Sequence, residues 1–440
     1  MTARRIASAI LLFGFAAMLA MNAPGQLSYD SVSQLADGRA GFYNSWHPLV
    51  MAWLLGLFDR LVPGTLLFLV FQGLMLLSAL LALLWLKPRG WSSVALAAAM
   101  VLMPQWLLYQ GEIWKDMLFA DAAIAGFAAL AVHAQTRKPA GLVLAAVLLA
   151  LAVSARQNGL ILLPVAAVTC GLIARRQDGS GWRQPWHQPW RQGVFFLAAV
   201  LALAGALNLA LASRTDGGEG ANAELRRGQS YDLAGALARD PGLVLPLNSD
   251  PGLEGALRTR GRALYSPLQS DAFAADPAIS QALSNASDGT IATAWQTLVL
   301  RHTLLYFRTR WADFAALVTS PDPIACHLVS IGVSGSPAQL KQLGLVAGNG
   351  PRAQALGNYS QLFVPTPVFS HLAWGALAMV LMVILIRRGE PADLVMSGLL
   401  ASALLFAMTF FFISIACDYR YLVFLDLSAM ASALYLVKKT

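Results

Sequence analysis

The chain has 440 residues, of which 57% are hydrophobic and only 12% are charged. An ordinary soluble domain has about twice that charged fraction, so the composition excludes a typical soluble protein. Apolar stretches of about twenty residues recur along the chain, and each is long enough to cross the ~30 Å apolar core of a bilayer as a helix. The composition therefore predicts an all-α polytopic membrane protein.

The net charge of +8 does not indicate a nucleic-acid partner, because of where the basic residues lie. Residues 214–365 hold twelve Arg or Lys and twelve Asp or Glu, so the excess comes from the other nineteen basic and eleven acidic residues. Fourteen of these nineteen lie in short segments between apolar stretches, as the positive-inside rule predicts for cytoplasmic loops. They are Arg4, Arg5, Lys87, Arg89, Arg137, Lys138, Arg175, Arg176, Arg183, Arg191, Arg387, Arg388, Lys438 and Lys439.

About ten membrane-spanning helices are predicted, with both ends of the chain in the cytoplasm. In chain order the spans are 5–23, 64–86, 91–109, 117–136, 140–155, 158–174, 193–212, 367–386, 393–414 and 421–437. We expect the first span to remain on the protein, because no clear signal-peptidase site follows it. The stretch 46–62 is short and has Asp59 and Arg60 near its end. It is predicted to lie in the outer interface as an amphipathic helix, because only then do the later basic clusters fall in the cytoplasm.

This predicted membrane topology divides the chain into three parts. Residues 1–212 form an N-terminal transmembrane module with a first outer loop at 24–63, residues 213–366 form a mainly helical periplasmic domain, and 367–440 form the C-terminal transmembrane helices. The outer segment is polar and turn-rich, and at about 150 residues it is long enough to bury a small core. Its stretch 291–318 is predicted to form one or two amphipathic helices, which either rest on the membrane surface or belong to the domain core.

Polar residues of four separate segments are predicted to reach the same outer face of the membrane. They are Asp30 and His47, then Glu112, Lys115 and Asp116, then Arg156 and Asn158, and finally Asp418, Arg420 and Tyr421. Ionisable groups near membrane spans are costly, which makes them candidates for function. The alternative is that they only terminate helices and pair with one another at the interface.

The order and sidedness of these residues resemble the GT-C superfamily of polytopic glycosyltransferases. Its members use polyprenyl-phosphate sugars, and the nearest resemblance is to the protein O-mannosyltransferase and aminoarabinose-transferase branch. The motifs that carry the resemblance are Asp30 after the first span, Trp46-His47-Pro48-Leu49, Glu112 through Asp116, and Arg420-Tyr421. The resemblance covers residues 1–212 and 367–440 and does not extend to 213–366.

The resemblance implies transfer of a sugar from a polyprenyl-phosphate donor to a glycan, lipid or protein acceptor. The reaction would take place at the periplasmic face of a bacterial inner membrane, with inversion at the anomeric carbon and Asp30 as the general base. Lys115, Arg156 and Arg420 would stabilise the charge on the leaving phosphate. His47 would contact the phosphate or sugar, or only cap its helix. The remaining candidates, expected to bind substrate or orient Lys115, are Glu112, Asp116, Asn158, Asp418 and Tyr421.

The first outer loop departs from the family pattern in one respect. Many members have two adjacent acids there, whereas Asp30 stands between Tyr29 and Ser31. A single carboxylate with one distant acid makes a poor site for a hard cation. We therefore expect no metal requirement and no other cofactor.

Three other functions stay open. An O-antigen ligase or polymerase would also have many spans and a large outer loop, and the pair Arg301-His302 would suit it. A transporter or flippase would need ionisable groups at mid-membrane, where this chain is almost entirely apolar apart from Asp121 and Asp426. No internal repeat supports a transporter either. The third alternative is a non-catalytic membrane scaffold.

The three cysteines, Cys170, Cys326 and Cys417, have no metal-type spacing. Cys326 and Cys417 are both predicted on the oxidising side of the membrane. A disulfide between them is one outcome, and two free buried thiols are the other.

Overall fold

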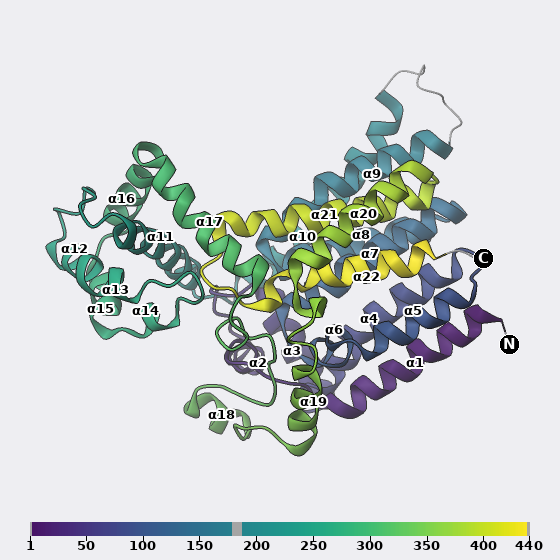
Figure 1. Ribbon diagram of the computed structural model, residues 1–440, viewed down its shortest axis with the longest axis horizontal. Coiled ribbons are helices and arrows are strands. Elements are labelled where there is room, and N and C mark those ends of the chain that lie inside the picture. Colours follow the sequence, from purple (N-terminus) through teal and green to yellow (C-terminus); the bar gives the residue numbers. More distant parts are fainter. Residues whose placement is uncertain (1, 178–186, 438–440) are drawn as a thin grey trace. The chain divides into compact units, whose positions relative to one another are not determined.

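The computed structural model describes residues 2–177 and 187–437, and the described chain folds into helices joined by turns (Figure 1). Within it, seven helices are long and apolar enough to cross a membrane, or eight if one bent pair of helices is a single span. This confirms an all-α polytopic membrane protein, as the composition predicted. The basic residues Arg183, Lys438 and Lys439 lie outside the described residues.

The chain forms two compact units, and each contains segments that are distant in the sequence. Unit 1 comprises residues 1–216, 329–407 and 422–440, and unit 2 comprises residues 217–328 and 408–421. The helices of unit 1 are α1 (Ala3–Asn22), α2 (Tyr29–Ala40), α3 (Leu49–Leu61), α4 (Leu66–Trp85), α5 (Trp91–Leu102), α6 (Pro104–Leu107), α7 (Lys115–Thr136), α8 (Pro139–Ala155), α9 (Leu162–Gln177), α10 (His187–Ala212), α18 (Pro337–Leu343), α19 (Pro351–Gln361), α20 (His371–Arg388), most of α21 (Pro391–Ile413) and α22 (Val423–Leu436). Unit 2 holds α11 (Glu219–Arg239), α12 (Pro251–Ala256), α13 (Arg262–Leu264), α14 (Asp271–Ala275), α15 (Pro277–Asn285), α16 (Asp288–Arg301) and α17 (Thr303–Thr319), together with the last turn of α21 (Pro391–Ile413).

Several apolar helices are shorter than the spans expected from the sequence. Helix α8 has 17 residues and α22 has 14, so at 1.5 Å per residue they are about 26 Å and about 21 Å long. The expected span 91–109 is α5 and α6, which meet at a bend of 60°. The bend lies at Met103-Pro104, where Met103 is extended and Pro104 begins α6, because a residue before proline disfavours the helical conformation.

Helix α3 covers most of the stretch expected to lie in the interface. Its 13 residues span about 20 Å, too little to cross the apolar core of a bilayer. It packs against α2, where Gly38 and Gly56 allow the two backbones to touch: a Cβ atom built on either glycine would overlap the backbone of the other helix. Nearby, the Arg39 guanidinium donates to both carboxylate oxygens of Asp59 at 2.8 and 2.9 Å, which lowers the pKa of Asp59.

Replacing Gly56 by alanine is expected to destabilise unit 1 by about 1–3 kcal/mol, because the added methyl group has no room against the Gly38 backbone. Thermal unfolding of the purified protein in detergent would measure the change. Gly205→Ala in α10 is the matched control, since a Cβ atom there meets nothing within 4 Å. Equal midpoints for the two variants would contradict close contact between α2 and α3.

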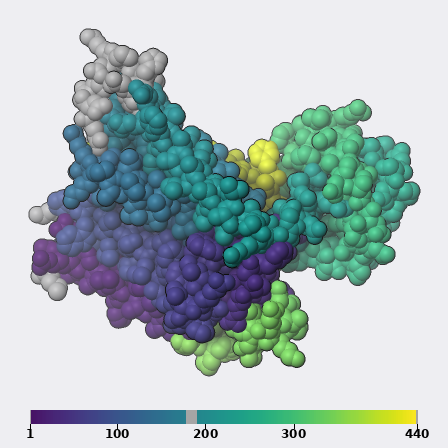
Figure 2. Space-filling view, turned by 180° about the vertical axis from the view of Figure 1, so that it is seen from behind, coloured from purple at the N-terminus to yellow at the C-terminus, as the bar shows by residue number. Residues whose placement is uncertain are grey.

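The segment 329–366 belongs to unit 1, although it was expected to fold with residues 213–328 as one periplasmic domain. Its backbone pairs with the segment that follows α1: the Leu27 N–H donates to the Gly332 carbonyl at 2.9 Å, and the Ser334 N–H donates to the Leu27 carbonyl at 2.8 Å. Figure 2 shows this segment in light green against the purple N-terminal part of unit 1. The sequence shows no signal for this backbone pairing, and the position of the segment outside the membrane stays a prediction.

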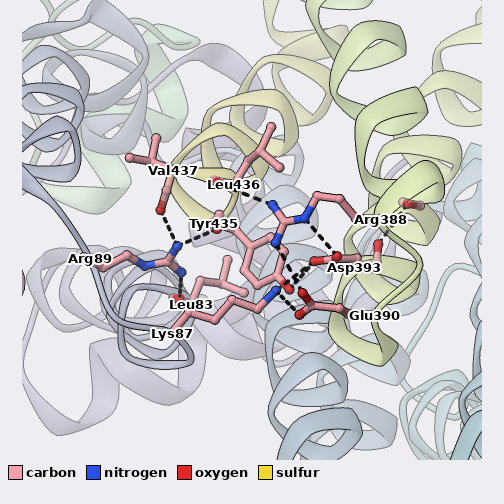
Figure 3. A network of polar contacts seen from close by, with 10 residues as sticks. Leu83, Lys87, Arg89, Arg388, Glu390, Asp393, Tyr435, Leu436 and Val437 are labelled. Carbon is pink, nitrogen blue, oxygen red and sulfur yellow. Dashed lines mark hydrogen bonds and ion pairs between the residues drawn. The ribbon is translucent and has the colours of Figure 1, made fainter. Parts of the chain in front are cut away.

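At the end of unit 1 where α1 begins and α22 ends (Figure 1), charged residues form a buried network (Figure 3). Asp393, which is fully buried, contacts Lys87 at 3.0 Å and Arg388 at 3.2 Å, and it accepts a hydrogen bond of 2.6 Å from the Tyr435 hydroxyl. Arg89 donates to the carbonyls of Leu83, Tyr435 and Val437 at 2.6–2.7 Å. Three of the basic residues attributed to cytoplasmic loops therefore join separate helices, in addition to any effect on membrane orientation.

Unit 2 has its own hydrophobic core, in which α11 packs between α16 and α17. The core side chains include Tyr231, Leu237, Ile291, Leu298 and Tyr306. The predicted mainly helical outer segment therefore buries a core, although the unit also includes residues 408–421 and lacks 329–366.

A buried ionic cluster lies beside this core. The Arg310 guanidinium contacts Asp232, lies 3.8 Å from Asp313, and donates to the Ser414 carbonyl at 2.6 Å. The Tyr265 hydroxyl donates to Asp313 at 2.5 Å. Burial raises the pKa of Asp313 to about 7, because two carboxyl groups share one guanidinium away from water.

This cluster predicts that unit 2 loses stability as the pH rises from about 4 to about 7. In that window the folded protein holds a proton on Asp313 that the unfolded chain has released, so folding is favoured on the acid side. Asp313→Asn keeps the acceptor for Tyr265 and is expected to flatten the slope. Hydrogen exchange of α11 and α17 in the full-length protein, measured between pH 5 and 8 and corrected for intrinsic rates, tests this. Asp271→Asn, at a carboxylate that is 73% exposed, should keep the wild-type slope, and an unchanged slope in Asp313→Asn would refute the prediction.

Candidate active site

The first turn of α2 presents Asp30, and its position is fixed by the residues around it. Ser28 caps the helix and exchanges side-chain contacts with Ser31 in a capping box. The Ser31 hydroxyl donates to the Ile113 carbonyl at 2.6 Å, and the Trp114 indole N–H donates to the Ser28 hydroxyl at 2.9 Å. The start of α2 is therefore attached to the segment that immediately precedes Lys115.

Asp30, His47 and Lys115 form a line of polar contacts. Asp30 Oδ1 lies 3.7 Å from His47 Nε2, and His47 Nδ1 lies 3.1 Å from Lys115 Nζ. A lysine ammonium has only donors, so Nδ1 of the imidazole accepts and its ring proton is assigned to Nε2, facing Asp30. The Asp30 side chain is 33% exposed and that of His47 is 11% exposed. The Asp30 carboxylate therefore lies near His47 and is partly exposed to solvent.

Asp116 and Arg156 form an ion pair directly beside this line. Asp116 follows Lys115 in the first turn of α7, and Arg156 caps the end of α8. The two side chains are in contact and nearly buried, 2% and 10% exposed, and Arg156 Nε also donates to Asn158 Oδ1 at 3.3 Å. The charge of Arg156 is therefore largely balanced by Asp116. Lys115 is connected to Asp30 through His47, which contacts both side chains.

Glu112 lies in the same region but faces the protein interior, with only 1% of its surface exposed. Its backbone is held on two sides: Gln26 and Glu112 form a parallel β-bridge, and the Gln72 side-chain amide donates to the Glu112 carbonyl at 3.0 Å. The segment around Glu112 thus joins α4 to the chain that connects α1 and α2. The Glu112 backbone is therefore anchored just before Lys115 and Asp116, while a role for its side chain stays a prediction.

Asp418, Arg420 and Tyr421 belong to unit 2, where they form a cluster of their own. Arg420 Nε lies 3.1 Å from Asp418 Oδ2, and the Arg420 guanidinium lies 5.6 Å from the centre of the Tyr421 ring. The Tyr421 ring stacks on Phe410 of α21. Seven candidate residues thus lie in unit 1: Asp30, His47, Glu112, Lys115, Asp116, Arg156 and Asn158. Asp418, Arg420 and Tyr421 lie in unit 2. A single site that combines both sets stays a prediction.

Other buried polar groups of unit 1 were not assigned to the site from the sequence. His371, the first residue of α20, lies with its Nδ1 2.9 Å from Asp426 Oδ1 of α22, and both side chains are fully buried. Asp121 of α7 accepts a hydrogen bond of 2.9 Å from Gln110. Asp121 and Asp426 were recognisable as acids within apolar spans, but nothing in the sequence identified His371 and Gln110 as their partners.

The described residues contain no group of three or more His, Cys, Asp or Glu side chains suited to holding a metal ion. The absence of a metal requirement stays a prediction. Comparisons with protein-family models, with curated proteins and with solved structures found no match to this chain.

Proposed function

We propose that this protein is a membrane glycosyltransferase of the GT-C type, with about ten spans and a polyprenyl-phosphate sugar as donor. The observation that supports the proposal most is the line Asp30–His47–Lys115, in which one imidazole contacts both a partly exposed carboxylate and a cation. Base-catalysed attack on a sugar phosphate requires both groups: one to accept a proton and one to stabilise the phosphate.

In the proposed reaction, Asp30 takes the proton from the acceptor hydroxyl or amine as its oxygen or nitrogen attacks the anomeric carbon. The bond between that carbon and the phosphate oxygen breaks on the opposite face, so the configuration inverts and the polyprenyl phosphate leaves with the electron pair. His47, whose Nε2 lies 3.7 Å from Asp30 Oδ1, is proposed to favour the ionised form of this carboxylate by electrostatic attraction. Lys115 balances the charge that develops on the phosphate, and Arg420 is proposed as a second cation.

The protein is proposed to lie in a bacterial inner membrane with this site facing the periplasm. The positive-inside pattern supports this orientation, because the network around Lys87, Arg89 and Arg388 and the ends of α1 and α22 share one end of unit 1. Reporter fusions at residue 280 and at the C-terminus are therefore expected to report opposite sides of the membrane. If both fusions report the same side, the predicted membrane topology is wrong, and so is the prediction that the stretch 46–62 does not cross the membrane.

The proposed activity is tested with the purified full-length protein in liposomes. Short-chain polyprenyl-phosphate sugars and polyprenyl-diphosphate sugars are supplied separately, and release of the free lipid phosphate is measured by mass spectrometry. Turnover of the monophosphate donor that is lost in Asp30→Asn supports the proposal. Turnover of the diphosphate donor alone would instead indicate a ligase or polymerase. No turnover of either donor over a range of sugars and acceptors would count against both enzymes.

A further inference from the structure

Helices α16 and α17 of unit 2 expose a stripe of large apolar side chains. Leu300, Leu304, Phe307 and Trp311 are 77%, 76%, 42% and 62% exposed. The last three are spaced three and four residues apart on α17, so they lie on one face of the helix. The opposite face carries Tyr306, Arg310 and Asp313, which are buried in unit 2. The stripe is thus the outward side of an amphipathic helix, and the domain core does not account for it.

The charges around the stripe have one sign. Arg301 and Arg308 are both exposed and lie next to the apolar residues in the sequence. The only acid in α17 is Asp313, which is 1% exposed and contacts Arg310 and Tyr265. An apolar face flanked by exposed arginines suits the boundary between lipid tails and phosphate headgroups, where the guanidinium groups reach the phosphates.

The contact between α17 and the end of α21 relates the position of the stripe to a candidate membrane span. Helix α21 is one of the candidate membrane spans and ends at Ile413. In its last turn, which belongs to unit 2, the Phe411 ring packs on Phe307 at 5.8 Å and on Phe314 at 5.9 Å. If α21 crosses the bilayer, a helix packed on its end would lie close to the bilayer surface. Met408, Phe412 and Ile413 of that turn are also 49–56% exposed, which continues the apolar surface onto α21.

We propose that the stripe Leu300, Leu304, Phe307 and Trp311 inserts into the lipid leaflet on the side of unit 2, with Arg301 and Arg308 at the phosphate headgroups. The continuity of the stripe with the end of a membrane span favours lipid over a protein partner. Trp311 suits this position, because indole rings concentrate at the interface between lipid and water. Unit 2 is then held on the membrane by its own surface as well as by its covalent connections.

The proposal is tested by spin labels on single cysteines in the full-length protein in liposomes that contain anionic lipid. Leu304→Cys and Leu300→Cys carry the label in a Cys170→Ser background, since Cys170 is the free cysteine of the chain. Collision rates are measured with oxygen, which concentrates in lipid, and with a water-soluble nickel chelate. At both positions we expect the ratio of oxygen to nickel collision rates to be several-fold higher than for a spin label exposed to water.

The matched control is Val244→Cys, an apolar residue of the same unit that is 78% exposed and lies outside the stripe. Its label should favour the nickel chelate. Labels at 300 and 304 that behave like the label at 244 would overturn the proposal. Protection from both reagents, with spin–spin coupling between copies, would overturn it too and would identify the stripe as a contact between two copies of this chain.

Discussion

Replacing Asp30 by asparagine is expected to lower the rate of sugar transfer by about 10²–10⁴-fold while leaving the protein folded in the membrane. The side chain keeps its size and its acceptor oxygen toward His47, but it no longer takes a proton from the acceptor. Asp30 is 33% exposed, so the substitution leaves no buried charge without a partner. Single-turnover rates in liposomes, measured with the protein in excess over the sugar donor, report the chemical step directly.

Two other variants show whether Asp30 acts as a general base or only binds the substrate. Lys115→Ala is expected to weaken donor binding as well as turnover, because the ammonium group meets the phosphate before and during the reaction. Asp37→Asn changes a carboxylate on the same helix, which accepts a hydrogen bond from the Asn44 N–H at 3.2 Å, and it should stay close to wild type. Near-normal turnover in Asp30→Asn would show that Asp30 is not the base, and Glu112 and Asp116 would be tested next.

Hydropathy predicted the existence of apolar helices because it is summed over many residues. The start and end of α4, for example, lie within a few residues of the expected span 64–86. Structural features that depend on a single residue were not predicted from the sequence. The bend at Pro104 was missed because the apolar run continues through it. The assignment of 329–366 to unit 1 depends on backbone pairs at Leu27, which no side-chain pattern reveals.

The candidate site also shows the difference between properties summed over many residues, which the sequence predicts, and contacts that depend on single side chains, which it does not. The predicted sidedness placed Asp30, His47 and Lys115 in one region, and the structure brings these three side chains together. It did not predict that Arg156 pairs with Asp116, because that contact depends on how α7 and α8 are rotated about their axes. Asp393 was expected only at the start of a span. Its complete burial against Lys87 and Arg388 follows from the approach of a distant turn.

The disulfide between Cys326 and Cys417 is expected to contribute about 2–5 kcal/mol to the stability of unit 2. The structure confirms the bonded alternative: the two residues are joined, and both are fully buried. They are 91 residues apart in the sequence, so the bond closes a long loop and removes much of the conformational freedom of the unfolded chain. Neighbouring backbone bonds depend on it, since the Tyr419 N–H donates to the Cys326 carbonyl at 2.9 Å.

Replacing both cysteines by serine should therefore lower the unfolding midpoint of unit 2 and increase hydrogen exchange in residues 408–421, which carry Asp418 and Arg420. A reductant should produce the same change in the wild-type protein and no further change in the double variant. Cys170→Ser is the control, because Cys170 is buried and unbonded. Since disulfides form in oxidising compartments, a bond that forms in cells also supports a periplasmic position for unit 2. Wild-type protein that contains two free thiols and unfolds identically with and without reductant would refute the bond and this route to stability.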